Sequence, residues 1–478
     1  MRFRSLGPVA LVALVGVLAA CQPVVPPPPP PPPPPNGGMA IGWTLPGVSG
    51  PIAADPANNV LWAMNKGAGT LDEVNPTTHA VEHHYNVSLN SQEHFPTPEV
   101  SPNGQWVVIE NGQSVVGIQV NSPDGTPTWT SPTLDGIVQS RPLIVSSVVV
   151  VATEGNSVYG LNLTTGTFAW TTTDATSSDH GQTLGTPETT SHIDSLSSDV
   201  PSGCGDITPL GITSNLVLGS NNDVYAVGEV QTSPTPGSGP PDFKMMAVSP
   251  ADGSVAVVPI SIVPTSMKTA PVEIWAEQQR AGLLTAGNNI YIGFGGLAGD
   301  CGVYHGYEVV VNESGTIQGD LKVAATTDAG AIWATAGGAV DSANNVYVST
   351  GNNTRGNPAT GTDYSDGVIA VPPSISGEIT APLNYFQPAE WQSDNNVDAD
   401  LGSNAAVLVA NGTKLFIIGK QHNAFLLSTN QLGGADHETP LGRLNGVCSG
   451  VSDGQNATLG TSAYFNCSSS GMVQVTLS

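Results

Sequence analysis

A short apolar strand pattern that recurs along the chain constrains its fold more than any other feature. The pattern occurs eight times, often after Asn or Gly, with starts 42 to 76 residues apart. The copies are VLWAM from Val60, WVVIE from Trp106, VVVVA from Val148, VYAVG from Val224, IYIGF from Ile290, VYVST from Val346, LFIIG from Leu415 and AYFNC from Ala463. After most copies a second strand, a small-residue turn and a third strand follow, as in SVYGLNLTTGTFAW (157–170). Because another apolar run precedes each copy, every unit offers four short strands.

Units of four short strands predict an all-β fold, an eight-bladed β-propeller. A lone four-stranded antiparallel sheet cannot bury both of its faces, and radial repetition buries them by stacking sheet on sheet. No stretch after residue 21 keeps a 3.6-residue apolar period, which argues against an α/β fold. Seven blades is the alternative, because weak repeats are easily miscounted.

The two ends of the folded part are predicted to share one blade. The last unit, 445–478, ends on MVQVTL (472–477) and lacks a fourth strand. The segment MAIGWTLPG (39–47) has the pattern of an outer strand, with a Trp like that of TFAW. We expect this segment to pair with MVQVTL and to close the ring, because such pairing removes an open sheet edge. The propeller is therefore predicted to span 39–478.

The first 38 residues have the pattern of an export signal and a spacer. A positively charged start precedes an uncharged run that is too short to be a stable transmembrane anchor. The run ends Leu-Ala-Ala before Cys21, which is typical of a bacterial lipoprotein signal peptide (1–20); an ordinary secretory signal is the alternative. Ten prolines follow, Pro26–Pro35, and ten residues of polyproline helix span roughly 30 Å. We expect a lipid on Cys21 and a linker (21–38) that holds the propeller off the outer face of the cytoplasmic membrane, although a proline run also serves as a docking ligand.

The charge balance argues against nucleic acid as a partner. The chain has 38 Asp and Glu residues against 12 Lys and Arg residues, and its formal net charge is -26. A chain this acidic repels phosphate backbones. Only 10% of the residues are charged and 39% are hydrophobic, which is the reverse of the composition of disordered chains. We expect a folded, exported, monomeric β protein.

Four cysteines remain besides Cys21, and an even number in an exported chain favours disulfides. Cys448 and Cys467 are 19 residues apart and flank a strand pattern, so we expect them to pair and to staple the closing blade. Cys204 and Cys301 then pair by elimination. Four free buried thiols are the alternative. No CxxC spacing occurs, which argues against a structural zinc site.

The units resemble those of the pyrroloquinoline-quinone (PQQ) dehydrogenase-like propellers. VYGLNLTTGTFAW is similar to their repeat, in which a Tyr-Ala-Leu strand leads through Thr-Gly to a Trp. Four longer stretches also resemble a group of exported bacterial PQQ-binding-like propellers, and the resemblance covers roughly residues 40 to 478. These stretches are ITPLGITSNLVL (207–218), GDCGVYHGYEVVV (299–311), IWATAGGAVDSANNVYVSTGN (332–352) with DYSDGVIAV (363–371), and YFQPAEWQSDNNVDADLGSNAAVLV (385–409).

The resemblance implies a candidate quinone site. In the dehydrogenases a Thr-Gly-Asn segment supplies an Asn ligand to a metal, and an Asp shortly after it acts as a base. Here STGN offers Asn352, and TDYSDG offers Asp363 or Asp366. Arg280 in QQRAGLL and His305 in YHGY are further candidates for the pocket. PQQ and calcium would be the cofactors under this interpretation.

Several departures from the family pattern favour a chain without a cofactor and without catalytic residues. The chain lacks the adjacent Cys pair that often stacks on the quinone, and no motif assigns a second metal-binding carboxylate. Only ten Lys and Arg residues remain once Arg2 and Arg4 leave with the predicted signal peptide, which is few for a site that must bind three carboxylates. Asn352 and Asp363 are better explained as turn residues, because Asn and Asp cap turns and tolerate the left-handed conformation.

Two other patterns are weak indications of a metal. DADLGS (398–403) has Val409 where a calcium loop requires Glu, so we expect a blade turn. His79, His83, His84 and His94 lie in a polar segment that we expect to be an exposed outer strand. No metal site is predicted from either pattern.

The sequence therefore favours a membrane-anchored, extracytoplasmic, non-catalytic binding or scaffold propeller with a protein or glycan partner. The first alternative is a PQQ- or metal-dependent dehydrogenase that acts on exported alcohols or sugars. A second alternative is a glycan hydrolase, which would need two carboxyl groups about 5 to 9.5 Å apart.

Overall fold

The computed structural model divides the chain into two units, residues 1–33 and 34–478, and only the second contains described residues. The predicted signal peptide, Cys21 and the proline run lie outside the described residues, as does His94. The described segments are 36–87, 96–122, 125–170, 180–194, 203–235, 239–268, 274–298, 301–353, 363–450 and 454–477.

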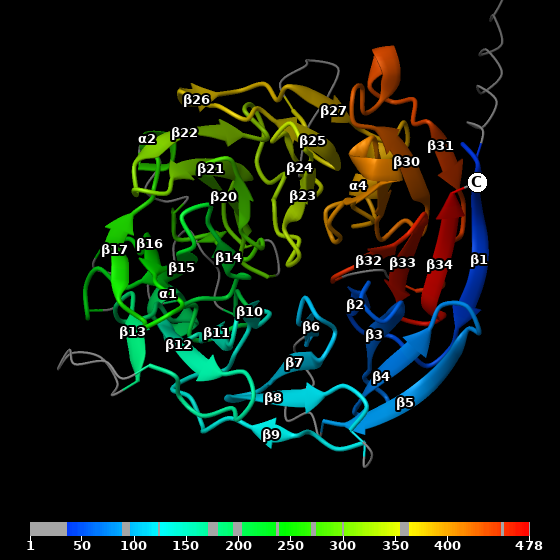
Figure 1. Cartoon of the computed structure of the whole chain (residues 1–478). Coiled ribbons are helices and arrows are strands. Elements are labelled where there is room, and N and C mark those ends of the chain that lie inside the picture. The colour runs from blue at the N-terminus through cyan, green and yellow to red at the C-terminus, as the bar shows by residue number, and fades with distance from the viewer. Residues whose placement is uncertain are drawn as a thin grey trace, which may run out of the picture. The chain divides into compact units, whose positions relative to one another are not determined.

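The described residues of the second unit form eight sheets arranged as blades around an axis (Figure 1). Neighbouring strands are antiparallel, except that β26 (Gly377–Ile379) joins β22 (Ile317–Lys322) in parallel. Blade 1 is β2 (Ile52–Asp55), β3 (Val60–Asn65), β4 (Thr70–Asn75) and β5 (Ala80–Asn86); blade 2 is β6 (Glu99–Val100), β7 (Trp106–Asn111), β8 (Ser114–Gln119) and β9 (Trp129–Thr130); blade 3 is β10 (Leu143–Val145), β11 (Val148–Ala152), β12 (Ser157–Asn162) and β13 (Gly181–Thr183); blade 4 is β14 (Val217–Leu218), β15 (Val224–Val230), β16 (Asp242–Val248) and β17 (Val255–Ser261).

The second half of the chain continues the pattern with one enlarged blade. Blade 5 is β18 (Glu277–Gln278), β19 (Leu284–Ala286), β20 (Asn289–Gly296), β21 (Tyr307–Asn312), β22 (Ile317–Lys322) and β26 (Gly377–Ile379); blade 6 is β23 (Gly338–Val340), β24 (Val346–Thr350), β25 (Gly367–Val371) and β27 (Asn384–Phe386); blade 7 is β28 (Val407–Val409), β29 (Lys414–Ile418), β30 (Ala424–Ser428) and β31 (Gly442–Leu444); blade 8 is β32 (Ala457–Leu459), β33 (Ser462–Cys467), β34 (Gly471–Leu477) and β1 (Met39–Leu45). The helical pieces are α1 (Thr190–Asp194), α2 (Thr265–Lys268), α4 (Trp391–Asn395), η2 (Ala410–Gly412) and η3 (Gly434–Asp436).

In every blade, one of the eight apolar runs forms the strand that follows the innermost strand, namely β3, β7, β11, β15, β20, β24, β29 and β33. The prediction of eight blades is therefore confirmed, and the alternative of seven is wrong. The ring closes as predicted. β1 pairs antiparallel with β34, from Met39 opposite Leu477 to Leu45 opposite Met472. Figure 1 shows the blue N-terminal strand beside the red C-terminal strand. One blade therefore holds both ends of the folded unit.

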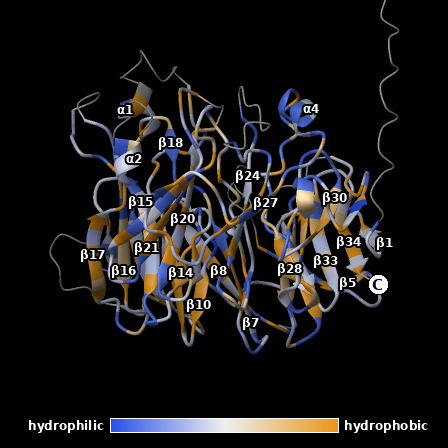
Figure 2. Ribbon diagram, turned by 90° about the horizontal axis from the view of Figure 1, so that it is seen from above, coloured by the Kyte–Doolittle hydropathy of each residue, from blue (hydrophilic) through white to orange (hydrophobic). Residues whose placement is uncertain are grey.

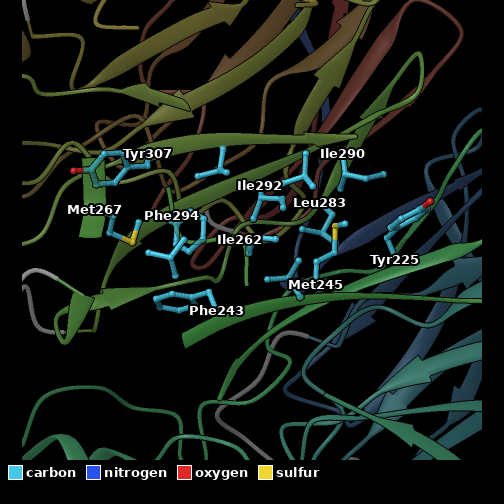
Figure 3. Packing of buried hydrophobic residues seen from close by; sticks show 14 of the residues in the cluster. Tyr225, Phe243, Met245, Ile262, Met267, Leu283, Ile290, Ile292, Phe294 and Tyr307 are labelled. Atoms are coloured by element: carbon cyan, nitrogen blue, oxygen red, sulfur yellow. The ribbon is translucent and has the colours of Figure 1, made fainter. Parts of the chain in front are cut away.

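Burial on both faces of every sheet explains why the second strands are continuous apolar runs. A strand with one face in water alternates apolar and polar residues, whereas a strand covered on both faces does not. All six residues of β7 are buried, and hydrophobic residues concentrate in the strands (Figure 2). Between blades 4 and 5, Phe243 meets Phe294 edge to face with ring centroids 5.0 Å apart (Figure 3). Such layers between blades are the core of this fold.

Aromatic residues of the outer segments fasten each blade to the next. Trp170, which follows β12, donates its indole N–H to the carbonyl of Pro250 in blade 4 at 3.0 Å. Its ring packs over Gly253, which has a φ of 75°, and a Cβ there would lie 2.6 Å from the ring. On the other side the ring covers Gly160 of its own blade, where a Cβ would lie 2.2 Å away. Both glycines are therefore required by the close approach of one indole.

The same contact recurs around the ring. Trp129 of blade 2 donates to the carbonyl of Leu163 in blade 3 at 2.8 Å. Trp43 of β1 stacks on His79 in the turn between β4 and β5, with ring centroids 5.0 Å apart. Among the described residues, Trp43 therefore joins blade 8 to blade 1 by ring stacking, without the indole N–H bond that Trp129 and Trp170 make.

Both predicted disulfides are present. The Cα atoms of Cys204 and Cys301 lie 5.8 Å apart, and those of Cys448 and Cys467 lie 5.3 Å apart. Cys467 ends β33, so the second bond ties the segment that enters blade 8 to the middle of that blade. None of the helices in the described segments is both long and apolar enough to cross a membrane.

Candidate functional site

The long connections of the chain emerge on one face of the ring. In a four-stranded antiparallel blade, the turn between the second and third strands lies on the same side as the link to the next blade. Figure 2 shows α1, α2, α4 and β18 along this side. We call it the loop face. It collects segments that are distant in the sequence, which is where a rigid ring places binding residues.

A pocket of about 300 Å³ lies between the loops of blades 5, 6 and 7, and we call it the face pocket. Its walls come from the loop after β20, the link between blades 5 and 6, the loop after β24, the link between blades 6 and 7, and the end of β29. The lining residues are Gly296, Leu297, Ala298, Tyr304, Ala331, Trp333, Asn352, Asp398, Asp400 and Lys420. This volume is at the lower end of the range of small-molecule sites, about 300–1,000 Å³.

One cation and two carboxylates form the polar side of the face pocket. Lys420 Nζ lies 2.8 Å from Asp400 Oδ2 and 3.1 Å from Asp398 Oδ1, and 5.2 Å from the ring centroid of Trp333. Asp400 is 1% exposed and Asp398 is 66% exposed. Burial raises the pKa of Asp400 against the pull of the Lys420 ammonium. Burial also works to lower the pKa of Lys420, but the two carboxylates outweigh it and the pKa lies above its ordinary value.

The opposite wall is braced by a disulfide. Leu297 and Tyr304 belong to a buried cluster that also contains Cys204, with Cys301 and Trp333 packed against it. The amide of Gly205 donates to the carbonyl of Ala298 at 2.9 Å. The Cys204–Cys301 bond therefore attaches the loop that carries this wall to the link before blade 4.

Of the four predicted quinone-site residues, Asn352 alone belongs to the lining of the face pocket given above. Asn352 lines the face pocket, and its carbonyl accepts the amide of Gly330 at 2.9 Å. His305 is buried in the loop after β20, where its amide donates to Glu277 Oε1 at 2.8 Å. Arg280 precedes the inner strand of blade 5 and donates to the carbonyl of Thr213. Burial lowers the pKa of Arg280.

The two candidate bases are tied into the backbone of the loop face. The Asp363 carboxylate accepts Thr327 Oγ1 at 2.7 Å, Asn353 Nδ2 at 2.6 Å and the amide of Ser365 at 3.1 Å. Asp366 has a φ of 51° and accepts the amide of Leu401 at 2.8 Å. Burial raises the pKa of Asp366 well above its ordinary value, and nearby carboxylates add to the effect. Residues 354–362, which separate STGN from these acids, lie outside the described residues.

A second cavity, about 370 Å³, lies where the inner strands meet at the axis. Its walls are mostly Leu, Val and Ala side chains, and Arg141 is its cation. The Arg141 guanidinium lies 3.4 Å from Glu99 Oε2 and 3.4 Å from Gln455 Oε1. Asn215 braces this end of the cavity, since it accepts the amide of Arg141 at 2.7 Å and donates to the carbonyl of Thr335 at 2.7 Å. The Arg141 guanidinium is therefore already engaged by an ion pair and a hydrogen bond to side chains of other blades.

These placements do not fit a quinone held with calcium. Such a group needs cations for its carboxylates and a converging set of metal ligands. Arg280 and Asp363 are instead engaged by structural hydrogen bonds. Within the described segments no three His, Cys, Asp or Glu side chains are arranged to hold a metal ion. We derive no quinone chemistry from this chain.

Sequence reasoning missed a set of buried acids. Glu110 in β7 and Glu308 in β21 are enclosed by apolar strands, and burial raises the pKa of each to about 8. Burial, with Glu188 and Glu277 nearby, raises the pKa of Glu229 in β15 well above its ordinary value. The available signal was a Glu inside an apolar strand, as in WVVIE, YEVVV and VYAVGEV. Sequence reasoning also missed Trp333 and Lys420, which supply the aromatic ring and the cation of the face pocket.

Comparisons with known proteins agree with the architecture. No family model and no curated protein matches the chain. The crystal structure of BamB from Moraxella catarrhalis is similar, with a TM-score of 0.53 and 11% identity over 91% of this chain and 97% of that chain. The computationally designed protein Ika8 gives a TM-score of 0.52 and 10% identity over 91% of this chain and 98% of its own. At these identities the likeness shows the fold alone, an eight-bladed β-propeller.

Proposed function

We propose that this chain is a non-catalytic binding or scaffold propeller. The observation that carries the proposal is that structural hydrogen bonds engage the side chains a quinone dehydrogenase would use for chemistry. Asp363 accepts three hydrogen bonds within the loop face, and Arg280 bonds a backbone carbonyl. The loop face offers instead a concave pocket with an aromatic side chain and a few polar groups, which is typical of binding sites.

We propose further that a lipid on Cys21 anchors the propeller to the outer face of the cytoplasmic membrane. The small residues before Cys21 and the ten prolines after it support this arrangement of anchor and spacer. Two disulfides are compatible with an oxidising, extracytoplasmic compartment. A propeller held off the membrane by such a spacer would be free to meet a protein or glycan partner.

A turnover assay tests the absence of catalysis. The purified chain would be mixed with PQQ and calcium, then with primary alcohols and aldoses, and reduction of an electron-accepting dye would be followed. A quinoprotein alcohol dehydrogenase assayed in parallel provides the positive control. We expect no dye reduction above the protein-free background. Steady turnover would overturn the proposal in favour of the dehydrogenase.

Mass spectrometry of the mature N-terminus tests the anchor. We expect a diacylglycerol-modified Cys21 as the first residue, and membrane association that Cys21→Ser abolishes. A mature N-terminus after residue 21, without lipid, would contradict the anchor and favour an ordinary secretory signal.

A further inference from the structure

The face pocket combines an aromatic platform with side chains that can bond hydroxyl groups. Trp333 is partly exposed, and its indole offers a flat apolar surface. Asp398 supplies an acceptor, Lys420 supplies the one donor that its two ion pairs leave, and the amide of Asn352 is able to supply both. A hydroxyl group is itself both a donor and an acceptor, so this mixture suits a ligand with several hydroxyls.

The charges of the pocket exclude other ligand classes. An anionic ligand would face the carboxylates of Asp398 and Asp400. A cationic ligand would meet Lys420, whose ammonium already lies 5.2 Å from the Trp333 ring centroid. A wholly apolar ligand would remove these charged groups from water without bonding them, at a large cost. The class that remains is neutral, rich in hydroxyls, and apolar on one face.

We propose that the face pocket binds a ring of a neutral saccharide. The C–H face of the sugar packs on the indole of Trp333, and its hydroxyls bond Asp398, Lys420 and Asn352. Hydrogen bonds to the charged groups are about twice as strong as neutral ones. This inference rests on the proposed binding function and names the ligand class of the pocket. It uses no catalytic step.

The wall of the pocket is held in place before any ligand arrives. The Cys204–Cys301 disulfide and the bond from the Gly205 amide to the Ala298 carbonyl fix the loop that carries Tyr304. On the other side, Lys420 joins the link before blade 7 to the end of β29 through two ion pairs. Such pre-organisation lowers the ordering cost of binding. The propeller therefore presents a rigid site for one sugar ring.

Calorimetric titration with defined oligosaccharides tests the proposal. The neutral probes are cellohexaose, maltohexaose, laminarihexaose and chitohexaose. The charged probes are a chitosan hexamer, which is the deacetylated and cationic form of chitohexaose, and an anionic galacturonate hexamer. We expect at least one neutral hexamer to bind at micromolar to millimolar concentration, and both charged hexamers to bind at least tenfold more weakly.

Variants connect that binding to the pocket. Trp333→Ala should weaken binding of the neutral hexamer at least tenfold, and Trp333→Phe should weaken it less because a smaller ring remains. Asp398→Ala should weaken it severalfold; circular dichroism would check that the variant folds, because Asp398 has a φ of 53° and pairs with Lys420. Glu438→Gln, an exposed acid outside the pocket, is the matched control and should bind like the parent chain.

The contrary results are separate from those that test the proposed function. Failure of every neutral hexamer to bind, preference for a charged hexamer, or equal affinity in Trp333→Phe, Asp398→Ala and the parent chain would each overturn the saccharide site. The turnover assay does not bear on these outcomes. Cleavage of a bound hexamer would instead leave the site standing and overturn the non-catalytic function.

Discussion

Carboxyl groups inside apolar strands are the unusual residues of this chain. Glu110 accepts the amide of Thr97 through Oε1 at 2.8 Å, while its Oε2 is buried without a hydrogen-bond partner among the described residues. A charged carboxylate in such a place loses its hydration, so the neutral form is favoured. Burial accordingly raises the Glu110 pKa to about 8, although Arg141 and Arg280 pull it down. The folded state therefore keeps a proton on this group at neutral pH.

We predict that Glu110 makes the propeller less stable as the pH rises. Between the ordinary pKa of 4.5 and the folded value of about 8, the folded chain binds a proton that the unfolded chain has released. This contribution to the free energy of unfolding is fully present below pH 4.5 and falls by up to about 1.4 kcal/mol per pH unit above it. Glu110→Gln keeps the shape and the Thr97 bond, so it should flatten the slope.

Denaturant unfolding across this pH range measures the effect. The parent chain, Glu110→Gln and the exposed control Glu438→Gln would be compared by their free energies of unfolding. The control should keep the parent slope. Equal slopes in the parent and in Glu110→Gln would show that Glu110 ionises freely in the folded state.

At the scale of elements, the blades depend on contacts that cross from one sheet to the next. Trp170 fills the space between two glycines and bonds the carbonyl of Pro250 in blade 4. Tyr385 of blade 6 makes an equivalent contact, since it stacks on His437 between β30 and β31 with centroids 3.9 Å apart. His437 has a φ of 63°, near the 61° of His79, which Trp43 contacts. A left-handed turn residue under an aromatic ring is thus a repeated joint.

We predict that Trp170→Ala lowers the free energy of unfolding by about 3–5 kcal/mol, because it empties the space between two blades. Trp170→Phe keeps most of the packing but loses the indole N–H hydrogen bond. Its free energy of unfolding should therefore fall by about 1 kcal/mol beyond the effect of the smaller buried area. Phe168→Ala is the comparison, since the half-buried Phe168 packs against Tyr159 and His180 of its own blade and only borders the layer between blades 2 and 3. Chemical denaturation measures all three. A loss in Trp170→Ala no greater than that in Phe168→Ala would refute the joint between blades.

At the scale of the whole molecule, the ring is closed by strand pairing between the two ends of the unit. β1 contributes Met39 and Trp43 to the buried layers on either side of blade 8. Without β1, the long strand β34 would present an open edge of unpaired backbone groups. The Cys448–Cys467 bond strengthens the same blade from its other side. Closure therefore covers the edge of blade 8, where the two ends of the folded unit meet.

We predict that deleting residues 39–45 lowers the melting temperature and promotes association, because β34 becomes an exposed edge. Differential scanning calorimetry and size-exclusion chromatography measure the two effects. Deletion of the ten prolines Pro26–Pro35 is the control and should leave the melting temperature of the ring unchanged. A ring without β1 that melts like the parent and stays monomeric would mean that closure contributes little.

The sequence by itself determined the blades. Eight apolar runs, their small-residue turns and the spare outer strand are local patterns, and they predicted the number of blades, the closing pair and the two disulfides correctly. They did not predict that β26, which follows β25 of blade 6 in the chain, pairs in parallel with β22 of blade 5. Local patterns suffice here because the main partners of each strand are its neighbours in the chain.

Only the tertiary structure decided what lies on the loop face. DADLGS was expected to be a blade turn, yet Asp398 and Asp400 line the face pocket with Trp333 and Lys420, which come from other connections. Asn352 and Asp363 were candidates from a family motif, with Arg280 and His305 as further candidates, yet only Asn352 of these four lines the face pocket. The physical reason is that links between blades join through three-dimensional packing, so no spacing in the sequence encodes which side chains meet.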